Sequence, residues 1–105
     1  MNVAKFLLTY HGGKLADTPE EQAKAMAAWE TWFSQIGSGV VDKGNPVGQI
    51  KTVASNGVRD GASSPSTGYS IISVNSIDEA VKASQMCPVL AGGGSVEIGE
   101  ILPIM

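Results

Sequence analysis

The sequence has very little cysteine and histidine. Cys87 is the single cysteine and His11 the single histidine among 105 residues. One cysteine excludes a disulfide within the chain and a cysteine-based zinc cluster. A metal site would need further ligands beside His11, and no second histidine can supply one. We therefore expect no metal and no cofactor.

The sequence also lacks an excess of positive charge and any long apolar run. Seven Lys and Arg residues stand against ten Asp and Glu, for a net charge of -3. Nucleic acid and anionic membranes are bound through basic surfaces, so neither partner is expected. No stretch approaches the roughly eighteen apolar residues of a membrane span. The first residues lack the features of a secretory signal, so we expect a cytoplasmic protein.

What is present is the composition of one small globular domain. Apolar residues make up 43% of the chain and charged residues 16%, far from the composition of disordered chains. A chain of 105 residues fits one domain over 1–105, burying roughly 65% of its extended surface.

The first half of the chain predicts a strand, a helix and a short second strand. Residues 3–10 are rich in strand formers, with apolar groups in both alternating sets. Thr18, with Glu21 three residues later, forms a capping box that begins a helix. Its apolar stripe contains Gln22, Ala25, Met26, Trp29, Trp32, Phe33 and Ile36. Gly37 is the expected end of this helix, and residues 40–41 the second strand.

The second half predicts a hairpin and a second strand-helix-strand unit. Residues 49–59 resemble a small hairpin that turns at Asn56-Gly57, the dipeptide preferred in type I' turns, and residues 61–68 a surface loop. Residues 69–74 form the clearest strand. Ser76 and Glu79 make a second capping box, whose helix is ended by Pro88 and the glycines at 92–94. Residues 96–102 form the last strand.

This element order predicts an α+β fold of the ferredoxin-like, split βαβ type, with two helices on an antiparallel sheet. Two helices cover one face of such a sheet, yet residues 3–10 and 69–74 carry apolar side chains on both faces. The simplest cover for the second face is the same face of another copy. We therefore predict a homodimer with sheet packed on sheet.

With these segments in view, the sequence resembles the YCII-related family, which includes proteins with a DGPF motif. The likeness runs nearly end to end. It is carried by residues 6–11 (Phe-Leu-Leu-Thr-Tyr-His), 18–21, 42–46 (Asp-Lys-Gly-Asn-Pro), 60–61, 68–72, 76–80, 87–88 and 94–98. The resemblance implies a dimeric α+β barrel and a small, mostly bacterial, cytoplasmic protein. It also implies that some members are enzymes acting on small, often aromatic molecules through a His-Asp pair.

One departure from the family pattern concerns the motif itself. Asp60-Gly61 stand where DGPF begins, but Ala62-Ser63 replace the Pro-Phe. The ligand geometry that the Pro-Phe turn supports is therefore not carried over to this chain.

His11 and Asp42 are the candidate catalytic residues. His11 ends the first strand immediately before Gly12-Gly13, and imidazole is the side chain best suited to acid-base work near neutral pH. Asp42 follows the second strand, from which its carboxylate could orient the imidazole. The alternative for His11 is a hydrogen-bonding surface residue, and for Asp42 a side chain that bonds its own turn before Gly44.

Three aromatic residues are candidates for ligand binding. Tyr10, Trp32 and Tyr69 each combine a ring face with one polar group, at strand ends or at the margin of the helical stripe. Trp29, at the centre of that stripe, is expected in the core. Cys87 precedes a proline at a helix end, a setting that disfavours a thiolate and indicates a structural cysteine.

Two functions follow as hypotheses. The first is a small homodimeric enzyme acting on an aromatic or lactone-like molecule through His11 and Asp42. The alternative is a non-catalytic domain of the same fold that binds a small molecule or a partner protein. A heme-binding or metal-handling role is weaker, because His11 alone could serve as the ligand.

Overall fold

The computed structural model of the chain describes residues 4–13 and 16–104. The strands are β1 (Ala4–His11), β2 (Val40–Asp42), β3 (Lys51–Ala54), β4 (Gly57–Asp60), β5 (Ser66–Val74) and β6 (Ser95–Ile101). The helices are α1 (Pro19–Ile36) and α2 (Ile77–Ser84), with short 3-10 turns η1 (Gly37–Gly39) and η2 (Pro88–Gly92).

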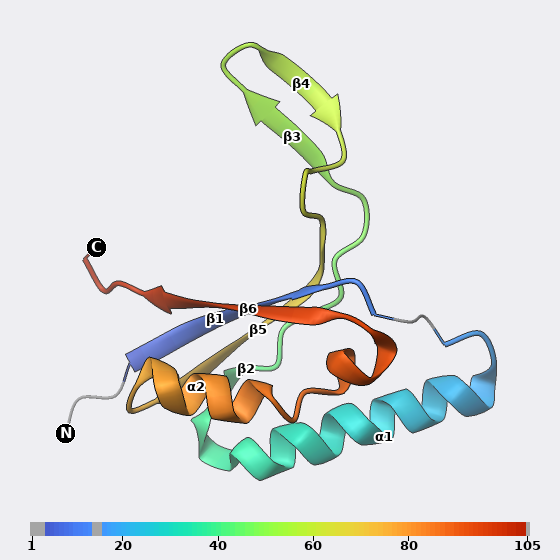
Figure 1. Cartoon of the computed structure of the whole chain (residues 1–105), viewed down its shortest axis with the longest axis vertical. Helices are drawn as coiled ribbons and strands as arrows, with labels where there is room; N and C mark the ends of the chain where they lie inside the picture. Colours follow the sequence, from blue (N-terminus) through green and yellow to red (C-terminus); the bar gives the residue numbers. More distant parts are fainter. Residues whose placement is uncertain (1–3, 14–15, 105) are drawn as a thin grey trace.

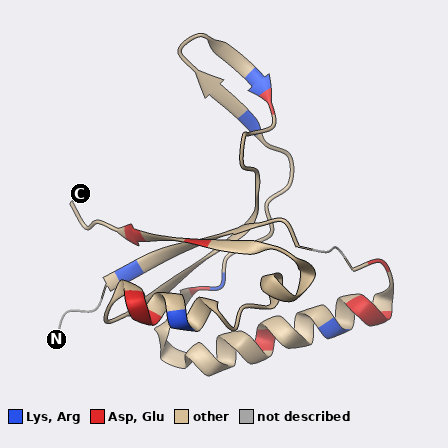
Figure 2. Ribbon diagram, viewed as in Figure 1, with Lys and Arg blue, Asp and Glu red and all other residues tan. Residues whose placement is uncertain are grey.

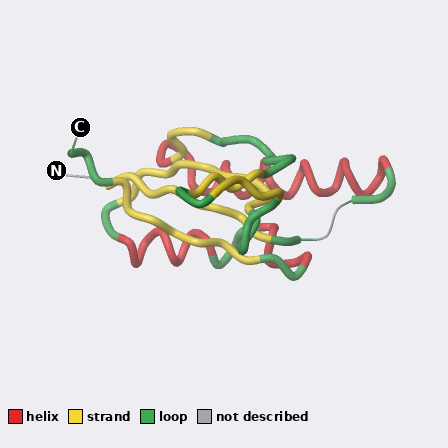
Figure 3. Tube along the Cα trace, turned by 90° about the horizontal axis from the view of Figure 1, so that it is seen from above, coloured by secondary structure: helices red, strands yellow, loops and turns green. Residues whose placement is uncertain are grey.

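Four strands form one antiparallel sheet in the order β2-β5-β1-β6, and β3 pairs with β4 in a separate two-stranded sheet. Figure 1 shows the larger sheet edge-on, with α1 and α2 on one side of it. Figure 3 shows the molecule from above, with the strands in the middle of the view, α1 along one side and α2 along the other. The prediction of an α+β fold with two helices on an antiparallel sheet is confirmed.

Both predicted capping boxes are present. The Thr18 hydroxyl accepts from the Glu21 N–H at 3.1 Å, and the Ser76 hydroxyl accepts from the Glu79 N–H at 3.2 Å. The Glu21 carboxylate in turn accepts from the Asp17 N–H at 3.0 Å. Each box therefore satisfies backbone donors that a helix start leaves unpaired.

The predicted apolar stripe of α1 covers the sheet at one end only. Trp32 and Phe33 are buried, whereas Met26 is 68% exposed and every residue of 19–28 is exposed. Figure 1 shows the reason, because the N-terminal half of α1 extends past the end of the sheet. The C-terminal part of the predicted stripe packs on the sheet. The N-terminal part, which is exposed, has no sheet beneath it.

Strand β5 begins earlier than predicted. It starts at Ser66 rather than Tyr69, so residues 66–68 of the predicted surface loop belong to the sheet. Of these residues only Thr67 favours a strand, and Gly68 disfavours one. Gly68 nevertheless pairs with Tyr10 and Ser66 with His11, and this pairing extends the strand.

The hairpin is confirmed, but its predicted turn is wrong by one residue. Ala54 pairs with Gly57, so the turn residues are 55 and 56 rather than Asn56-Gly57. Neither turn residue has a positive φ, which excludes the predicted type I' turn. The observed register places Val53 opposite Val58 and lets Lys51 pair with Asp60, contacts that a shift of the turn would break.

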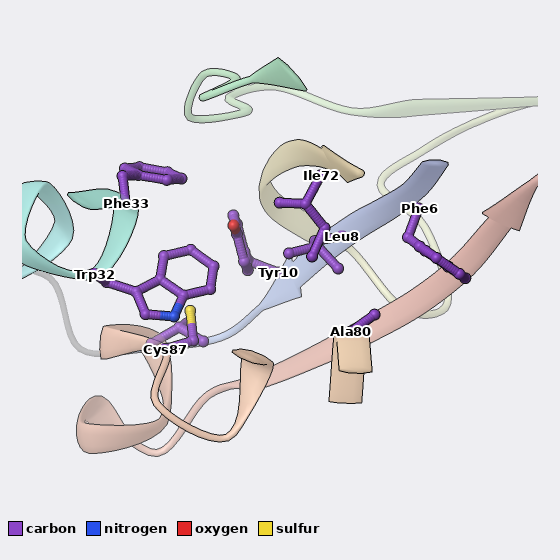
Figure 4. Close-up of a cluster of buried hydrophobic side chains, with 9 residues drawn as sticks. Phe6, Leu8, Tyr10, Trp32, Phe33, Ile72, Ala80 and Cys87 are labelled. Carbon is purple, nitrogen blue, oxygen red and sulfur yellow. The ribbon is translucent and has the colours of Figure 1, made fainter. Parts of the chain in front are cut away.

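The core lies between the helices and the covered face of the sheet (Figure 4). Its buried apolar members are Phe6, Leu8 and Tyr10 of β1, Ile72 of β5, Trp32 and Phe33 of α1, Ala80 of α2, and Cys87 and Val89 near η2. Within the described part of the chain, no helix is both long and apolar enough to cross a membrane.

Candidate functional site

Both described helices lie on one face of the sheet, and we call the other face the open face. Because successive side chains of a strand point to opposite faces, burial of Phe6, Leu8 and Tyr10 directs Leu7, Thr9 and His11 of β1 outward. The backbone register then sets their neighbours. Thr9 lies between Tyr69 of β5 and Glu97 of β6. Directly paired residues share a face, so Tyr69, Thr9, Glu97 and His11 form one cluster.

His11 is held between two acceptors. Its Nδ1 lies 3.1 Å from the Pro65 carbonyl oxygen, and its Nε2 contacts the Glu97 carboxylate. The His11 side chain is 15% exposed, whereas that of Glu97 is 70% exposed. The imidazole is therefore the inner member of the pair, and the carboxylate is the member that meets solvent.

The two acceptors bear on which ring nitrogens of His11 carry a hydrogen. A neutral imidazole has one N–H and donates to one acceptor, whereas the protonated ring donates from both nitrogens. A carbonyl oxygen accepts hydrogen bonds and cannot donate them, and the same holds for an ionised carboxylate. A doubly protonated His11 therefore satisfies both neighbours, and loss of one proton leaves one contact unsatisfied.

Ser64 is a third group beside the ring. Its hydroxyl lies 3.4 Å from His11 Nδ1, at the margin of a hydrogen bond and farther away than the Pro65 carbonyl at 3.1 Å. A serine nucleophile needs an unprotonated nitrogen to accept its proton. The Pro65 carbonyl instead favours a proton on Nδ1, so the geometry does not favour a serine-histidine-acid triad.

Asp42, the predicted partner of His11, lies elsewhere on the sheet. Its carboxylate accepts from the Gly44 N–H at 2.8 Å, within its own turn. Asp42 is on β2, which is separated from β1 by β5, and it pairs with Ile71, which itself lies opposite Leu7. His11 is four residues farther along β1, about 13 Å at 3.3 Å per residue. Within one chain the structure does not bring His11 and Asp42 together.

The Tyr10 side chain is part of the core. It is 5% exposed, and its hydroxyl donates to the Ser70 hydroxyl at 2.7 Å. Ser70 donates onward to the Lys43 carbonyl at 2.6 Å. Burial raises the pKa of Tyr10 above its ordinary value, while the bond to Ser70 acts in the opposite direction. The predicted ligand contact would therefore require this buried chain of bonds to open.

The Trp32 side chain is also part of the core. It is 2% exposed, and its indole N–H donates to the Ala83 carbonyl at 2.9 Å. Trp29, which was expected in the core, is half-buried and stacks edge-on against Tyr10 with ring centroids 5.0 Å apart. Of the three aromatic residues predicted to contact a ligand, Tyr69 is the one that faces the same side of the sheet as His11.

The sequence reasoning missed Glu97. The residue lies within a predicted strand, where an exposed glutamate carries no signal of its own. Its place beside His11 depends on the β1–β6 register, which pairs His11 with Ser95 and Thr9 with Glu97. The antiparallel order of the split βαβ fold makes these two strands neighbours, so a fold-based search for carboxylates on the last strand could have found it.

Cys87 is buried, with 3% of its surface exposed. Burial raises the pKa of the Cys87 thiol to about 11, opposed by a hydrogen bond from the backbone of Val89. Thiolate is the reactive form of cysteine, so Cys87 is not placed as a nucleophile. Among residues 4–13 and 16–104, His, Cys, Asp and Glu side chains form no group of three or more that could hold a metal ion.

Two hollows of the described surface lie away from His11. One of about 200 Å³ is lined by Glu30, Phe33 and neighbouring residues, and another of about 280 Å³ by Trp32, Met86 and neighbours. Both are on the helix side of the molecule. Neither of these two hollows is lined by His11.

Comparison of the chain with protein-family models gave no match. Comparison with curated proteins gave no match either.

Proposed function

We propose that the chain is a homodimeric enzyme of the YCII-related type, whose His11–Glu97 pair exchanges a proton with a small molecule bound on the open face. The observation that carries this proposal is the imidazole held between the Pro65 carbonyl and an exposed carboxylate. A half-buried imidazole in contact with an exposed carboxylate is a geometry suited to moving one proton at a time. In this proposal Glu97 takes the role that the sequence had predicted for Asp42.

The neighbouring side chains favour a flat, partly apolar ligand. Tyr69 offers a ring and a phenol one strand away, and Leu7 on the same face of β1 is 39% exposed. Thr9, between Tyr69 and Glu97, adds a hydroxyl that donates and accepts. An aromatic or lactone-like molecule with one group that gains or loses a proton fits this set of contacts.

The surface area of the chain supports a homodimer. Its accessible surface is 7354 Å², whereas a compact monomer of 10.8 kDa exposes about 5,500 Å². The excess is roughly 1,800 Å² per chain. Obligate dimers bury about 1,000 to 2,500 Å² on each partner, so a second copy accounts for an excess of this size.

The open face is the surface that this second copy would cover. Leu7 and Ile101 are large apolar residues on this face that are 39% and 37% exposed. Packed sheets lie about 10 Å apart, which leaves room for a small molecule between the two faces where small side chains meet. Such packing would turn the surface around His11 into an enclosed site.

One observation favours the non-catalytic alternative. Both ring nitrogens of His11 already face protein acceptors, so the ring has no position that is open to a ligand without movement of Glu97. A domain that binds a small molecule without converting it would tolerate this arrangement. The two functions predict different effects on turnover when the charge of Glu97 is removed.

A ligand screen separates these possibilities. We expect ligand-observed NMR with a set of aromatic acids and lactones to give binders to the wild-type protein that Tyr69→Ala weakens. For the enzyme, Glu97→Gln abolishes turnover of a bound compound, followed by its own NMR signals, while binding changes less than tenfold. Asp42→Asn is the matched control and leaves both intact. Turnover that survives Glu97→Gln but not Asp42→Asn would overturn the proposal, and binding without turnover would favour the alternative.

A further inference from the structure

The β3–β4 hairpin stands apart from the rest of the molecule, and we call residues 51–60 the arm. Figure 1 shows it rising from the side of the sheet opposite the helices. Each strand of the arm has the other as its main packing partner. The radius of gyration is 15.1 Å, against about 13 Å for a compact domain of this length. The arm thus projects from the open face into the space that a second copy would occupy.

The arm has no core of its own. All of its residues are exposed except the half-buried Thr52. Val53 and Val58 lie opposite each other and are 77% and 65% exposed. A two-stranded hairpin without a covered apolar face is marginally stable in water at best. A cross-strand valine pair at the end of a projecting arm therefore indicates a surface that is covered by another molecule.

The base of the arm is nevertheless well organised. The Lys51 ammonium contacts the Asp60 carboxylate at 2.8 Å, and the Thr52 hydroxyl donates to the Gly61 carbonyl at 2.6 Å. The Gly61 N–H donates to the Ile50 carbonyl at 2.8 Å. A preformed binding segment loses less conformational entropy on docking, which favours association.

Charge and length both point to a second copy as the partner. The arm contains Lys51, Arg59 and Asp60, a net charge of +1, so the other residues of the chain carry -4 of the total of -3. Figure 2 shows two basic residues and one acidic residue on the arm, charges of both signs along the helices, and acidic residues on β6. From residue 47 to residue 55 the chain can reach about 26 Å at 3.3 Å per residue. This exceeds the spacing of about 10 Å between packed sheets.

We propose that the arm clasps a second copy of this chain, reaching past the partner's sheet so that Val53 and Val58 pack on the partner's surface. The inference rests on the proposed homodimer, because the arm projects on the side where the two sheets meet. It adds a second contact area to the sheet-on-sheet interface. It also explains why the chain keeps an exposed apolar hairpin, which would otherwise favour aggregation.

The test uses the full chain with a paired substitution that preserves the hairpin. Val53→Thr with Val58→Thr keeps β-branched side chains with high strand preference but replaces two methyl groups by hydroxyls. We expect the dimer dissociation constant, measured by sedimentation, to rise at least tenfold. Val81→Thr is the matched control, since Val81 is 40% exposed on α2 in the helix layer, and it leaves the constant unchanged.

Amide hydrogen exchange on the wild-type protein gives a second readout. We expect the amides of β3 and β4 to be protected in the dimer, because an arm docked on a partner opens rarely. A wild-type dimer with unprotected arm amides and an unchanged constant in the valine variant would overturn the arm proposal alone. A wild-type protein that remains a monomer at all concentrations would overturn the proposed homodimer and the arm contact together.

Discussion

At the scale of single residues, the position of a proton depends on which acceptors surround it. His11 lies between the Pro65 carbonyl and Glu97, whereas Asp42 is bonded to the Gly44 N–H in its own turn. The sequence correctly placed His11 at the end of the first strand. The carboxylate that contacts His11 could not be predicted in this way. Asp42 and Glu97 differ in strand register, and local sequence does not show that difference.

The His11–Glu97 contact predicts how Glu97→Gln and Asp42→Asn affect the NMR signals of the His11 ring nitrogens. The chain has a single histidine, so nitrogen-detected NMR of the imidazole gives one pair of ring signals. We expect Glu97→Gln to shift the Nε2 signal strongly, because a charged acceptor is replaced by an amide. Asp42→Asn should leave both ring signals unchanged. Equal shifts in the two variants would contradict the pairing.

Burial of Cys87 and Tyr10 predicts a loss of stability at high pH. Burial raises the pKa of Cys87 to about 11 from an ordinary value of 9.0, and it raises the pKa of Tyr10 as well. Between pH 9 and 11 the unfolded chain loses the Cys87 proton while the folded chain keeps it. The free energy of unfolding therefore falls, by at most about 1.4 kcal/mol per pH unit for this one group.

Urea unfolding followed from pH 7 to pH 11 checks this prediction. Below pH 9 both states hold the proton, so Cys87 contributes no pH dependence there. In Cys87→Ala the decline should begin about one pH unit higher, where the unfolded tyrosines ionise. A variant that follows the wild-type profile would show that Cys87 is not protected from ionisation by the fold.

At the scale of secondary-structure elements, local signals were the reliable ones. Both capping boxes depend on residues three apart and were predicted correctly. The hairpin turn was misplaced because Asn56-Gly57 is locally favourable, while the pairing of Val53 with Val58 decides the register. The exposure of the first half of α1 depends on where the helix begins relative to the sheet, which periodicity does not encode.

The contact between β6 and the end of β1 depends on Gly94. A Cβ at this position would lie 2.6 Å from Val89 Cγ2 and 2.7 Å from the His11 carbonyl oxygen. We expect Gly94→Ala to lower the free energy of unfolding by about 1 to 3 kcal/mol, because the backbone must move to make room. Gly48→Ala is the control, since nothing lies within 4 Å of its Cβ position. Equal stability of the two variants in urea would contradict the close approach.

At the scale of the whole molecule, the two described helices leave one face of the sheet uncovered. The helices cover one face of the sheet, the arm rises from the other, and the accessible surface of 7354 Å² exceeds that of a compact monomer by roughly 1,800 Å². The sequence predicted an uncovered face from apolar residues in both alternating sets. It did not predict the projecting arm, because a hairpin pattern does not reveal whether the hairpin packs on its own domain.

The mass of the protein in solution is the measurement that tests this account most directly. Sedimentation equilibrium at micromolar concentration should give twice the chain mass of 10.8 kDa, because in the proposed dimer a second copy would cover the open face and enclose the site around His11. A mass of one chain at every concentration would contradict the account. It would leave the His11–Glu97 pair on an uncovered surface and the arm without a partner.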